Sequence, residues 1–319
     1  MLKKTTEFDS ERDFHKLYNE NPKNLEAVEK VLKVSLVARG NILQISGADD
    51  KVNSCEELFS LLKMAKNQGL GLRCSDFSRF LNTVADGNAI QLHKLLSKPL
   101  VLKIRKKSVV PRNLSQRNFL DLILNKDLVF GIGPAGTGKT FLAMIVALDS
   151  LLKGEVQKIV LARPAVEAGE ALGFLPGDLE EKLLPYLRPL YDAMDEVLGP
   201  VEARKLIEAG VVEIAPLAYM RGRTLSNCFA LLDEAQNTTR SQMMMFLTRL
   251  GEGSKMVVTG DLTQVDLPPK ERSGLLEAKK YLSKVEGVYF HEFDNMDVVR
   301  HPLVSRIISA YGANKNKGS

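Results

Sequence analysis

The chain has 319 residues, of which 45% are hydrophobic, and its 44 Lys and Arg against 39 Asp and Glu give a net charge of +5. This length predicts two domains, and the hydrophobic content is ordinary for a globular protein that can build a sizeable core. No apolar run approaches ~18 residues and the N-terminus is polar, so we expect no membrane span, no signal peptide and a cytoplasmic location. Cys55, Cys74 and Cys228 are scattered, which suits a reducing compartment and gives no metal-ligand spacing.

Residues 1–97 predict a small α+β domain. Helices are expected at Asn24–Leu32, Asp49–Asn67, Ser75–Val84 and Ala89–Leu96, and strands at Ser35–Ala38 and Ile42–Ile45. The helix–strand–strand–helix order resembles a KH-type RNA-binding module. Such modules grip phosphates with a G-x-x-G loop, and none lies between these helices. A docking or oligomerisation domain is the alternative interpretation.

The basic excess of the chain lies in its first third. Residues 1–110 hold 19 Lys and Arg against 13 Asp and Glu, and no acidic residue falls between Asp86 and Asp121. Residues 98–112 are expected to form a basic linker. Its cations are Lys98, Lys103, Arg105, Lys106, Lys107 and Arg112. Such a stretch either neutralises nucleic-acid phosphates or is a solvated linker without a ligand.

From residue 113 to residue 312, strands are expected to alternate with helices. The strands are expected at Leu128–Phe130, Lys158–Ala162, Val211–Ile214, Phe229–Leu232, Lys255–Thr259 and Val288–Phe290. The helices are expected at Ser115–Asn125, Lys139–Leu152, Leu179–Leu198, Val201–Ala209, Ser241–Leu250, Gly274–Leu282 and Val298–Tyr311. This alternation predicts a doubly wound, mostly parallel α/β sheet, whose ligands bind beyond the carboxyl ends of the strands. Residues 313–319 are expected to be a disordered tail.

The segment Gly133–Thr140 matches G-x-x-x-x-G-K-[ST], the phosphate-binding loop of P-loop NTPases. Its glycines allow the tight turns that aim backbone N–H groups at phosphate oxygens, and the following helix adds its positive end. Lys139 is expected to contact the β- and γ-phosphates of ATP, and Thr140 to bind Mg²⁺. The residues expected to contact the nucleotide are Gly133, Pro134, Ala135, Gly136, Thr137, Gly138, Lys139 and Thr140.

The same glycines allow a second interpretation. Gly131, Gly133 and Gly136 spell G-x-G-x-x-G, the dinucleotide fingerprint. That motif requires an acidic residue about 20 positions further on, at the end of the second strand. Arg163 follows the second predicted strand instead, and an arginine there suits a 2′-phosphate, so this point alone does not exclude a dinucleotide site. Gly138-Lys139-Thr140, however, has no role in such a site, which favours the P-loop.

Two further predicted strands end in polar residues that suit phosphate chemistry. Phe229–Leu232 leads into Asp233 and Glu234, so Asp233 is expected to hold Mg²⁺ and Glu234 to act as general base on the attacking water. Lys255–Thr259 leads toward Gln264, which is expected to contact the γ-phosphate or that water. Ordinary surface turns are the alternative for both segments.

The loop Gly133–Thr140 and the segments Asp233–Gln236 and Gly260–Gln264 resemble motifs I, II and III of superfamily 1 helicases. Several further segments are similar to the PhoH-like ATPase family: Ala162–Glu170, Leu172–Gly177, Tyr219–Leu225 and Val299–Leu303. The resemblance covers nearly all of residues 110–312. It implies a RecA-like ATPase that uses ATP and Mg²⁺, forms a homo-oligomeric ring and acts in RNA metabolism. It also implies a separate metal-dependent endoribonuclease as a partner.

The resemblance also assigns roles to single residues. Gln116 resembles the upstream glutamine that reads adenine, and Arg163 lies in a segment similar to the nucleic-acid contact motif Ia. Only one RecA-like domain fits into about 200 residues. An arginine from a neighbouring copy is therefore expected to reach the γ-phosphate. Arg300 is the favoured candidate because it lies where the motif VI arginine would fall, and Arg221, Arg223 and Arg272 are the alternatives.

The function expected from these residues is ATP hydrolysis linked to RNA, with RNA bound by the basic first third and the Arg163 segment. A nucleotide-switched scaffold that presents a partner ribonuclease, with incidental hydrolysis, is the alternative. A small-molecule kinase is a third hypothesis, and the helicase-like segments Asp233–Gln236 and Gly260–Gln264 argue against it.

Overall fold

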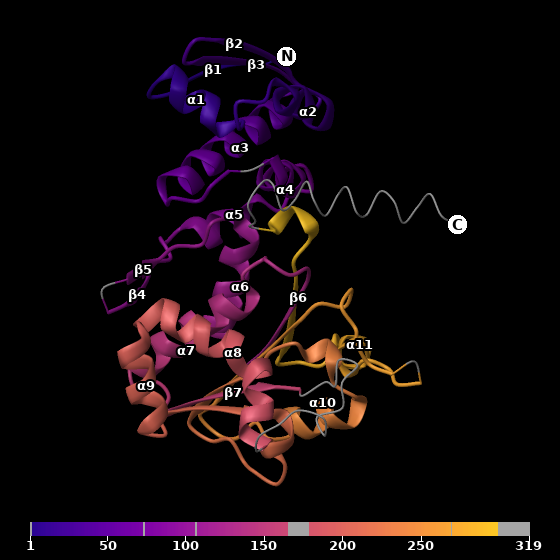
Figure 1. The fold of residues 1–319 in the computed structure, drawn as a ribbon. Coiled ribbons are helices and arrows are strands. Elements are labelled where there is room, and N and C mark those ends of the chain that lie inside the picture. The colour runs from indigo at the N-terminus through magenta and orange to yellow at the C-terminus, as the bar shows by residue number, and fades with distance from the viewer. Residues whose placement is uncertain (1, 73, 106, 165–178, 269, 299–319) are drawn as a thin grey trace, which may run out of the picture. The chain divides into compact units, whose positions relative to one another are not determined.

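The computed structural model describes residues 2–72, 74–105, 107–164, 179–268 and 270–298 (Figure 1). The chain divides into two compact units. The first comprises Met1–Leu102 and Ser108–Asp121, and the second comprises Lys103–Lys107 and Leu122–Ser319. No helix among the described residues is both long and apolar enough to span a bilayer.

The first unit combines a three-stranded antiparallel sheet with helices. Its elements are β1 (Leu2–Glu7), α1 (Glu11–Leu17), α2 (Pro22–Leu32), β2 (Ser35–Arg39), β3 (Ile42–Gly47), α3 (Asp49–Asn67), α4 (Cys74–Ala85) and α5 (Ala89–Leu96). The strand order is β1-β3-β2. All elements expected from the sequence are present, so the small α+β architecture is confirmed.

The sequence analysis missed β1 and α1. The residues of β1 include one large apolar side chain, Leu2, and the strand forms by pairing with β3 across some forty residues of chain, from Leu2 opposite Gly47 to Glu7 opposite Ile42. Helix α1 has seven residues, too few to show a clear period, and begins at Ser10, whose hydroxyl accepts from the Asp13 N–H at 3.1 Å.

A single aromatic and aliphatic core holds the first unit together. The rings of Phe8 and Phe14 stack with their centroids 4.5 Å apart, and Phe59 of α3 closes on both. The connection from α1 to α2 runs through Asn19 and Glu20, both of which have left-handed backbone angles. This connection contains no glycine, which agrees with the absence of a G-x-x-G loop from the sequence.

The stretch expected to be a basic linker contains two short strands, β4 (Leu102–Ile104) and β5 (Lys107–Val109), which pair with each other. Arg105 donates to a Glu202 carboxylate oxygen at 2.6 Å, and Lys107 donates to the backbone carbonyl of Glu196. Arg105 and Lys107 both belong to the second unit, so these two cations are engaged within that unit by a carboxylate and a backbone carbonyl, which the charge pattern did not indicate.

The second unit is built on a six-stranded, fully parallel sheet. Its strands are β6 (Leu128–Ile132), β7 (Lys158–Arg163), β8 (Val212–Pro216), β9 (Cys228–Leu232), β10 (Lys255–Gly260) and β11 (Val288–Glu292). The order is β11-β6-β10-β9-β7-β8, and every paired register is parallel. All six predicted strands are present, so the α/β class is confirmed. Parallel pairing brings the carboxyl ends of β6, β10 and β9 to one edge.

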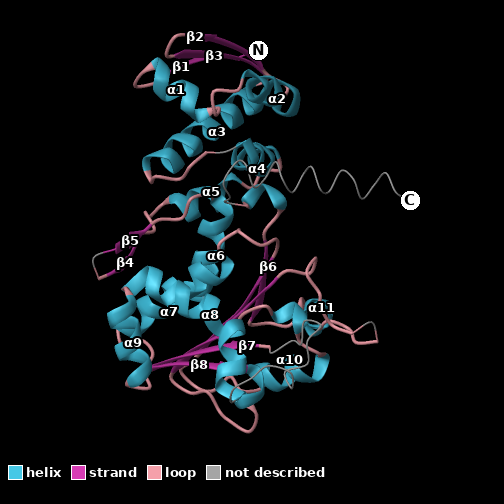
Figure 2. Ribbon diagram, viewed as in Figure 1, coloured by secondary structure: helices cyan, strands magenta, loops and turns pink. Residues whose placement is uncertain are grey.

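Helices cover both faces of this sheet (Figure 2). They are α7 (Lys139–Leu152), α8 (Leu179–Leu198), α9 (Pro200–Glu208), α10 (Arg240–Leu247) and α11 (Gly274–Leu282). The helix before β6, α6 (Leu114–Asn125), begins in the first unit and ends in the second. Helix α7 packs on β7, β9 and β10, and α8 packs on α7, β7 and β8. Helices α10 and α11 pack together and share a core with Phe130, Val258 and other sheet residues. The helix expected at Val298–Tyr311 falls almost wholly outside the described residues.

Candidate functional site: a P-loop pocket

The segment Gly133–Thr140 connects β6 to α7 as the sequence predicts. A side chain at Gly133 would place its Cβ 2.6 Å from both the backbone oxygen and the Cβ of Phe293, so this position accepts only glycine. Gly136 and Gly138 have φ angles of 85° and 88°, which side chains rarely adopt. The loop therefore has the tight, glycine-dependent backbone that a phosphate cradle requires.

Lys139 is the first residue of α7 and is buried. Its ammonium group donates to the backbone carbonyls of Gly133 at 2.6 Å and Pro134 at 2.8 Å. These bonds hold the side chain back along the loop and place its charge within the cradle. The ammonium group is thus positioned to meet a phosphate that enters the loop.

Thr140 and Asp233 form the pair expected to bind a metal ion. The Thr140 hydroxyl donates to Asp233 Oδ1 at 2.6 Å, and the Thr259 hydroxyl of β10 donates to the same oxygen at 2.8 Å. Hydroxyl and carboxylate oxygens are the hard ligands that Mg²⁺ prefers, so these residues fit that ion. The described residues contain no group of three or more His, Cys, Asp or Glu that would hold a metal alone. A site of this kind is completed by phosphate oxygens and water.

Glu234 follows β9 with a φ of 51°, a strained backbone for a residue other than glycine. Both of its carboxylate oxygens are engaged. Oε1 lies 2.9 Å from Arg163 Nη2, and Oε2 accepts from Gln236 Nε2 at 2.6 Å. The structure therefore aims Glu234 at the pocket and restrains it there through two partners.

Asp261 connects the end of β10 to the loop. Its carboxylate accepts the Ala135 N–H at 3.1 Å, the Thr263 hydroxyl at 2.7 Å and the Gln264 side-chain amide. Burial alone would raise the pKa of Asp261, but the hydrogen bonds, led by those from Thr263, outweigh it and hold the pKa below its usual value. Asp261 thus remains ionised and holds Gln264 beside the phosphate loop.

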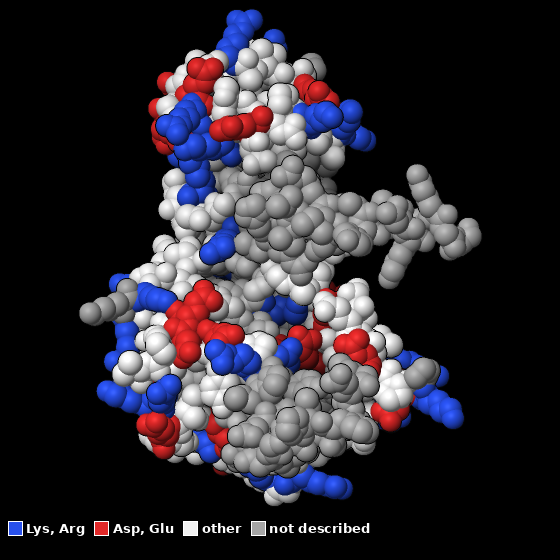
Figure 3. All heavy atoms as spheres, viewed as in Figure 1, with Lys and Arg blue, Asp and Glu red and all other residues white. Residues whose placement is uncertain are grey.

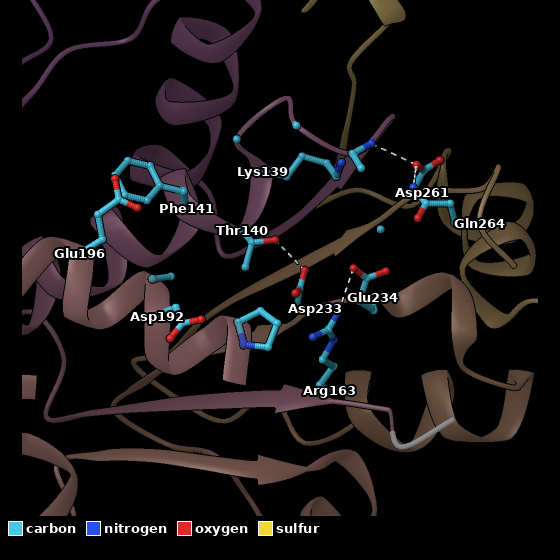
Figure 4. A pocket seen from close by; sticks show the side chains of 16 residues that line it. Lys139, Thr140, Phe141, Arg163, Asp192, Glu196, Asp233, Glu234, Asp261 and Gln264 are labelled. Carbon is cyan, nitrogen blue, oxygen red and sulfur yellow. Dashed lines mark hydrogen bonds and ion pairs between the residues drawn. The ribbon is translucent and has the colours of Figure 1, made fainter. Parts of the chain in front are cut away.

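These side chains line one pocket of about 470 Å³ (Figure 4). The loop, Asp233, Glu234 and Gln264 all contribute to it, as the sequence predicts. The sequence analysis missed the contribution of α8, which lines the pocket with Pro189, Asp192, Ala193 and Glu196. Asp192 and Glu196 lie four residues apart on a predicted helix, a spacing that places them on one face and could have pointed to this contribution.

The remaining candidates belong to the first unit, have contacts not expected from the sequence, or fall outside the described residues. Gln116 belongs to the first unit, where it is buried and its amide oxygen accepts the Arg112 N–H at 2.9 Å. Its role in reading adenine stays a prediction. Arg163, expected to contact nucleic acid, lines the nucleotide pocket beside Glu234. Arg300 and the segment Leu172–Gly177 lie outside the described residues.

The alternative arginines differ in their surroundings. Arg223 binds both carboxylate oxygens of Glu213, at 2.5 and 2.9 Å. The hydrogen bonds that Glu213 accepts, first from Arg223 and then from Lys158, lower the pKa of Glu213 to about 2. Arg223 therefore forms an ion pair within its own chain, with Glu213. Arg221 and Arg272 are both exposed.

A glycine-dependent loop, a lysine within it, and a threonine of the following helix paired with an aspartate at the end of a parallel strand define a nucleotide-binding protein of the P-loop class. One strand, β10, separates the loop strand β6 from the aspartate strand β9. Comparison with known proteins identifies the family of the chain. A profile of the PhoH-like proteins matches residues 108–312, and the chain belongs to that family.

Individual relatives agree with this assignment. The chain is 46% identical over 295 residues to a PhoH-like protein of Bacillus subtilis, covering 92% of each chain. It is 49% identical over 298 residues to one of Mycobacterium tuberculosis H37Rv, covering 93% of this chain and 84% of the relative. Protein PhoH of Escherichia coli K12 is 45% identical over 205 residues, which cover 64% of this chain and 58% of that protein.

Solved structures resemble the chain only distantly. The Pif1 helicase from Candida albicans aligns at 14% identity with a TM-score of 0.34, covering 63% of this chain and 43% of that one. The UvsW helicase from bacteriophage T4 aligns at 13% identity with a TM-score of 0.36, covering 63% and 66%.

Proposed function

We propose that this protein binds ATP with Mg²⁺ in the P-loop pocket and hydrolyses it, and that RNA regulates this activity. One observation carries the proposal. A phosphate cradle, a lysine, a pair of metal-binding oxygens, a carboxylate and a glutamine converge on one pocket from β6, α7, β9 and β10. Each of these groups has a separate task in phosphoryl transfer to water.

Each group in the pocket has its own role in ATP hydrolysis. The loop amides and the Lys139 ammonium group stabilise negative charge on the phosphates. Thr140 and Asp233 hold Mg²⁺, which neutralises charge on the phosphate oxygens. Glu234 accepts a proton from the attacking water as the bond to the γ-phosphate forms, and the Gln264 amide orients that water. ADP then leaves with inorganic phosphate.

Glu234 must first be released from part of its network. A carboxylate whose two oxygens already accept from Arg163 and Gln236 has less capacity to accept a proton from water. A ligand that draws Arg163 away frees one oxygen. Phosphate groups are the natural competitors for a guanidinium group, so either the nucleotide or an RNA backbone provides this release.

The RNA part of the proposal rests on charge and on family. The first third of the chain is basic, and Arg163 belongs to the helicase-like segment. Lys and Arg mix with Asp and Glu over the face drawn in Figure 3, so that face offers scattered cations. Assembly into a ring, an arginine such as Arg300 supplied by a neighbouring copy, a cytoplasmic location and a partner endoribonuclease complete the proposal.

Steady-state phosphate release with and without single-stranded RNA tests both parts. We expect turnover that requires Mg²⁺, rises with RNA at low salt and is lost in Lys139→Ala. Lys153→Ala is the matched control, because Lys153 lies at the other end of α7 and pairs with Asp149. Turnover unaffected by Lys139→Ala contradicts the ATPase, and turnover that RNA does not change contradicts the RNA link alone.

The restrained state of Glu234 also favours a second candidate, a nucleotide-switched scaffold with slow hydrolysis. In that case ATP binding drives assembly and the presentation of a partner enzyme. Light scattering with and without a non-hydrolysable ATP analogue distinguishes the two. Assembly that depends on nucleotide, together with negligible turnover in the presence of RNA, supports the scaffold, and a monomer in both conditions excludes it.

A further inference from the structure

The nucleotide pocket has two chemically different ends. In the view of Figure 4, Lys139, Asp261 and Gln264 lie on one side and Phe141 and Glu196 lie on the other. The first side carries the cradle and the lysine for phosphates. The second side is formed by the first turn of α7 and by α8, which pack against each other. This second side has no assigned role.

Glu196 lies in the last turn of α8, which ends at Leu198 and contains no basic residue in that turn. A carboxylate here opposes the helix dipole and costs helix stability. No side chain in the described part of the protein pairs with this carboxylate. Asp192, one turn earlier, accepts from Arg188 Nε at 3.1 Å. Helix stability therefore gives no reason for an acidic residue at position 196.

The backbone at Glu196 is nevertheless held in place, and its side chain is exposed. Lys107 donates to its backbone carbonyl, and α8 continues into α9 at Pro200. Its side chain lines the pocket together with Ala193 and the half-buried ring of Phe141. A carboxylate repels phosphates but accepts strongly from hydroxyl groups. A ligand in this pocket must therefore present phosphates to the loop and hydroxyl donors to α8.

We propose that the Glu196 carboxylate binds the ribose hydroxyls of the nucleotide and that Phe141 and Ala193 form the apolar wall beside the sugar and base. Two vicinal hydroxyls suit one carboxylate, which accepts from both. The site therefore selects ribonucleotides over 2′-deoxyribonucleotides. This inference rests on the proposed binding of ATP. It adds contacts to the ribose and the base, which the P-loop motif does not bind.

Equilibrium binding of ATP, 2′-deoxy-ATP and inorganic triphosphate, each with Mg²⁺, tests the inference. We expect the protein to bind ATP about tenfold more tightly than 2′-deoxy-ATP, the worth of one hydrogen bond to a charged group. Glu196→Ala should weaken ATP binding by a similar factor and remove the preference. Glu196→Gln should retain part of it, because an amide oxygen still accepts. Triphosphate affinity should not fall in either variant, since that ligand has no sugar.

Asp195→Asn is the matched control, because it removes a carboxylate from the neighbouring exposed position, which does not line this pocket. It should keep the preference for ATP. Equal affinity of the wild type for ATP and 2′-deoxy-ATP overturns the inference, as does equal tightening of both ligands in Glu196→Ala, which would show simple repulsion. In both cases triphosphate still binds, and the proposed ATP site stands. Failure of all three ligands to bind the wild type would instead overturn the proposed function.

Discussion

The guanidinium group of Arg163 lies 2.9 Å from a carboxylate oxygen of Glu234, although 70 residues of chain separate them. The side chain of Arg163 is 18% exposed and that of Glu234 is 35% exposed, and both line the pocket. It joins the residue expected to contact nucleic acid to the residue expected to activate water. We therefore expect binding at one of these groups to change the other.

Replacing Arg163 by alanine should raise ATP turnover in the absence of RNA and abolish any stimulation by RNA. The partly exposed pair is worth about 1 kcal/mol, so the expected increase is about fivefold. Phosphate release measured over a range of RNA concentrations checks this. A fall in turnover at every RNA concentration would show instead that Arg163 stabilises the transition state directly.

Glu234→Gln should bind ATP with nearly unchanged affinity and hydrolyse it at least ~10²-fold more slowly, because an amide cannot accept the proton from water. A fluorescent ATP analogue reports binding, and single-turnover phosphate release reports chemistry. Glu252→Gln is a suitable control, because Glu252 lies in the loop before β10 and does not line the pocket. Hydrolysis at the wild-type rate would remove Glu234 from the mechanism.

Gly133→Ala should destabilise the second unit and disrupt the loop. Its Cβ would lie 2.6 Å from the Phe293 backbone, which cannot yield as a side chain does, and the expected loss is at least ~2 kcal/mol. Gly154→Ala is the comparison: that glycine has a φ of +73° and nothing within 4 Å, so only the backbone strain of about 1 kcal/mol applies. Chemical denaturation of both variants measures the difference, and equal losses would contradict the close contact.

The Glu213 carboxylate should make stability depend on pH. Its pKa of about 2 in the folded protein lies below the unfolded value of about 4.3. A lowered pKa stabilises the fold above the unfolded value, and that contribution is lost as pH falls from about 5 to about 2. Glu213→Gln should cost about 2 kcal/mol at pH 7 and reduce the acid dependence of unfolding over this window. An unchanged pH profile would show that the ion pair with Arg223 and Lys158 contributes nothing.

The local features of the site could be predicted from the sequence because they depend on neighbouring residues. The loop Gly133–Thr140 contains its own turns, and β6 and α7 on either side show their periods within a few residues. Asp233 and Glu234 follow an apolar strand directly. The six strands are short apolar runs, and parallel pairing then carries their ends to one edge.

Contacts between distant segments were decided by the tertiary structure alone. The packing of α8 on α7 brings Glu196 into the pocket, and the adjacency of β7 and β9 brings Arg163 to Glu234. Strand β1 forms only by pairing with β3, and two cations of the basic stretch meet Glu202 and Glu196. The sequence by itself determined the phosphate-binding chemistry, because that chemistry lies in contiguous residues. The partners of its charged groups depend on which segments pack together, and no local pattern records that.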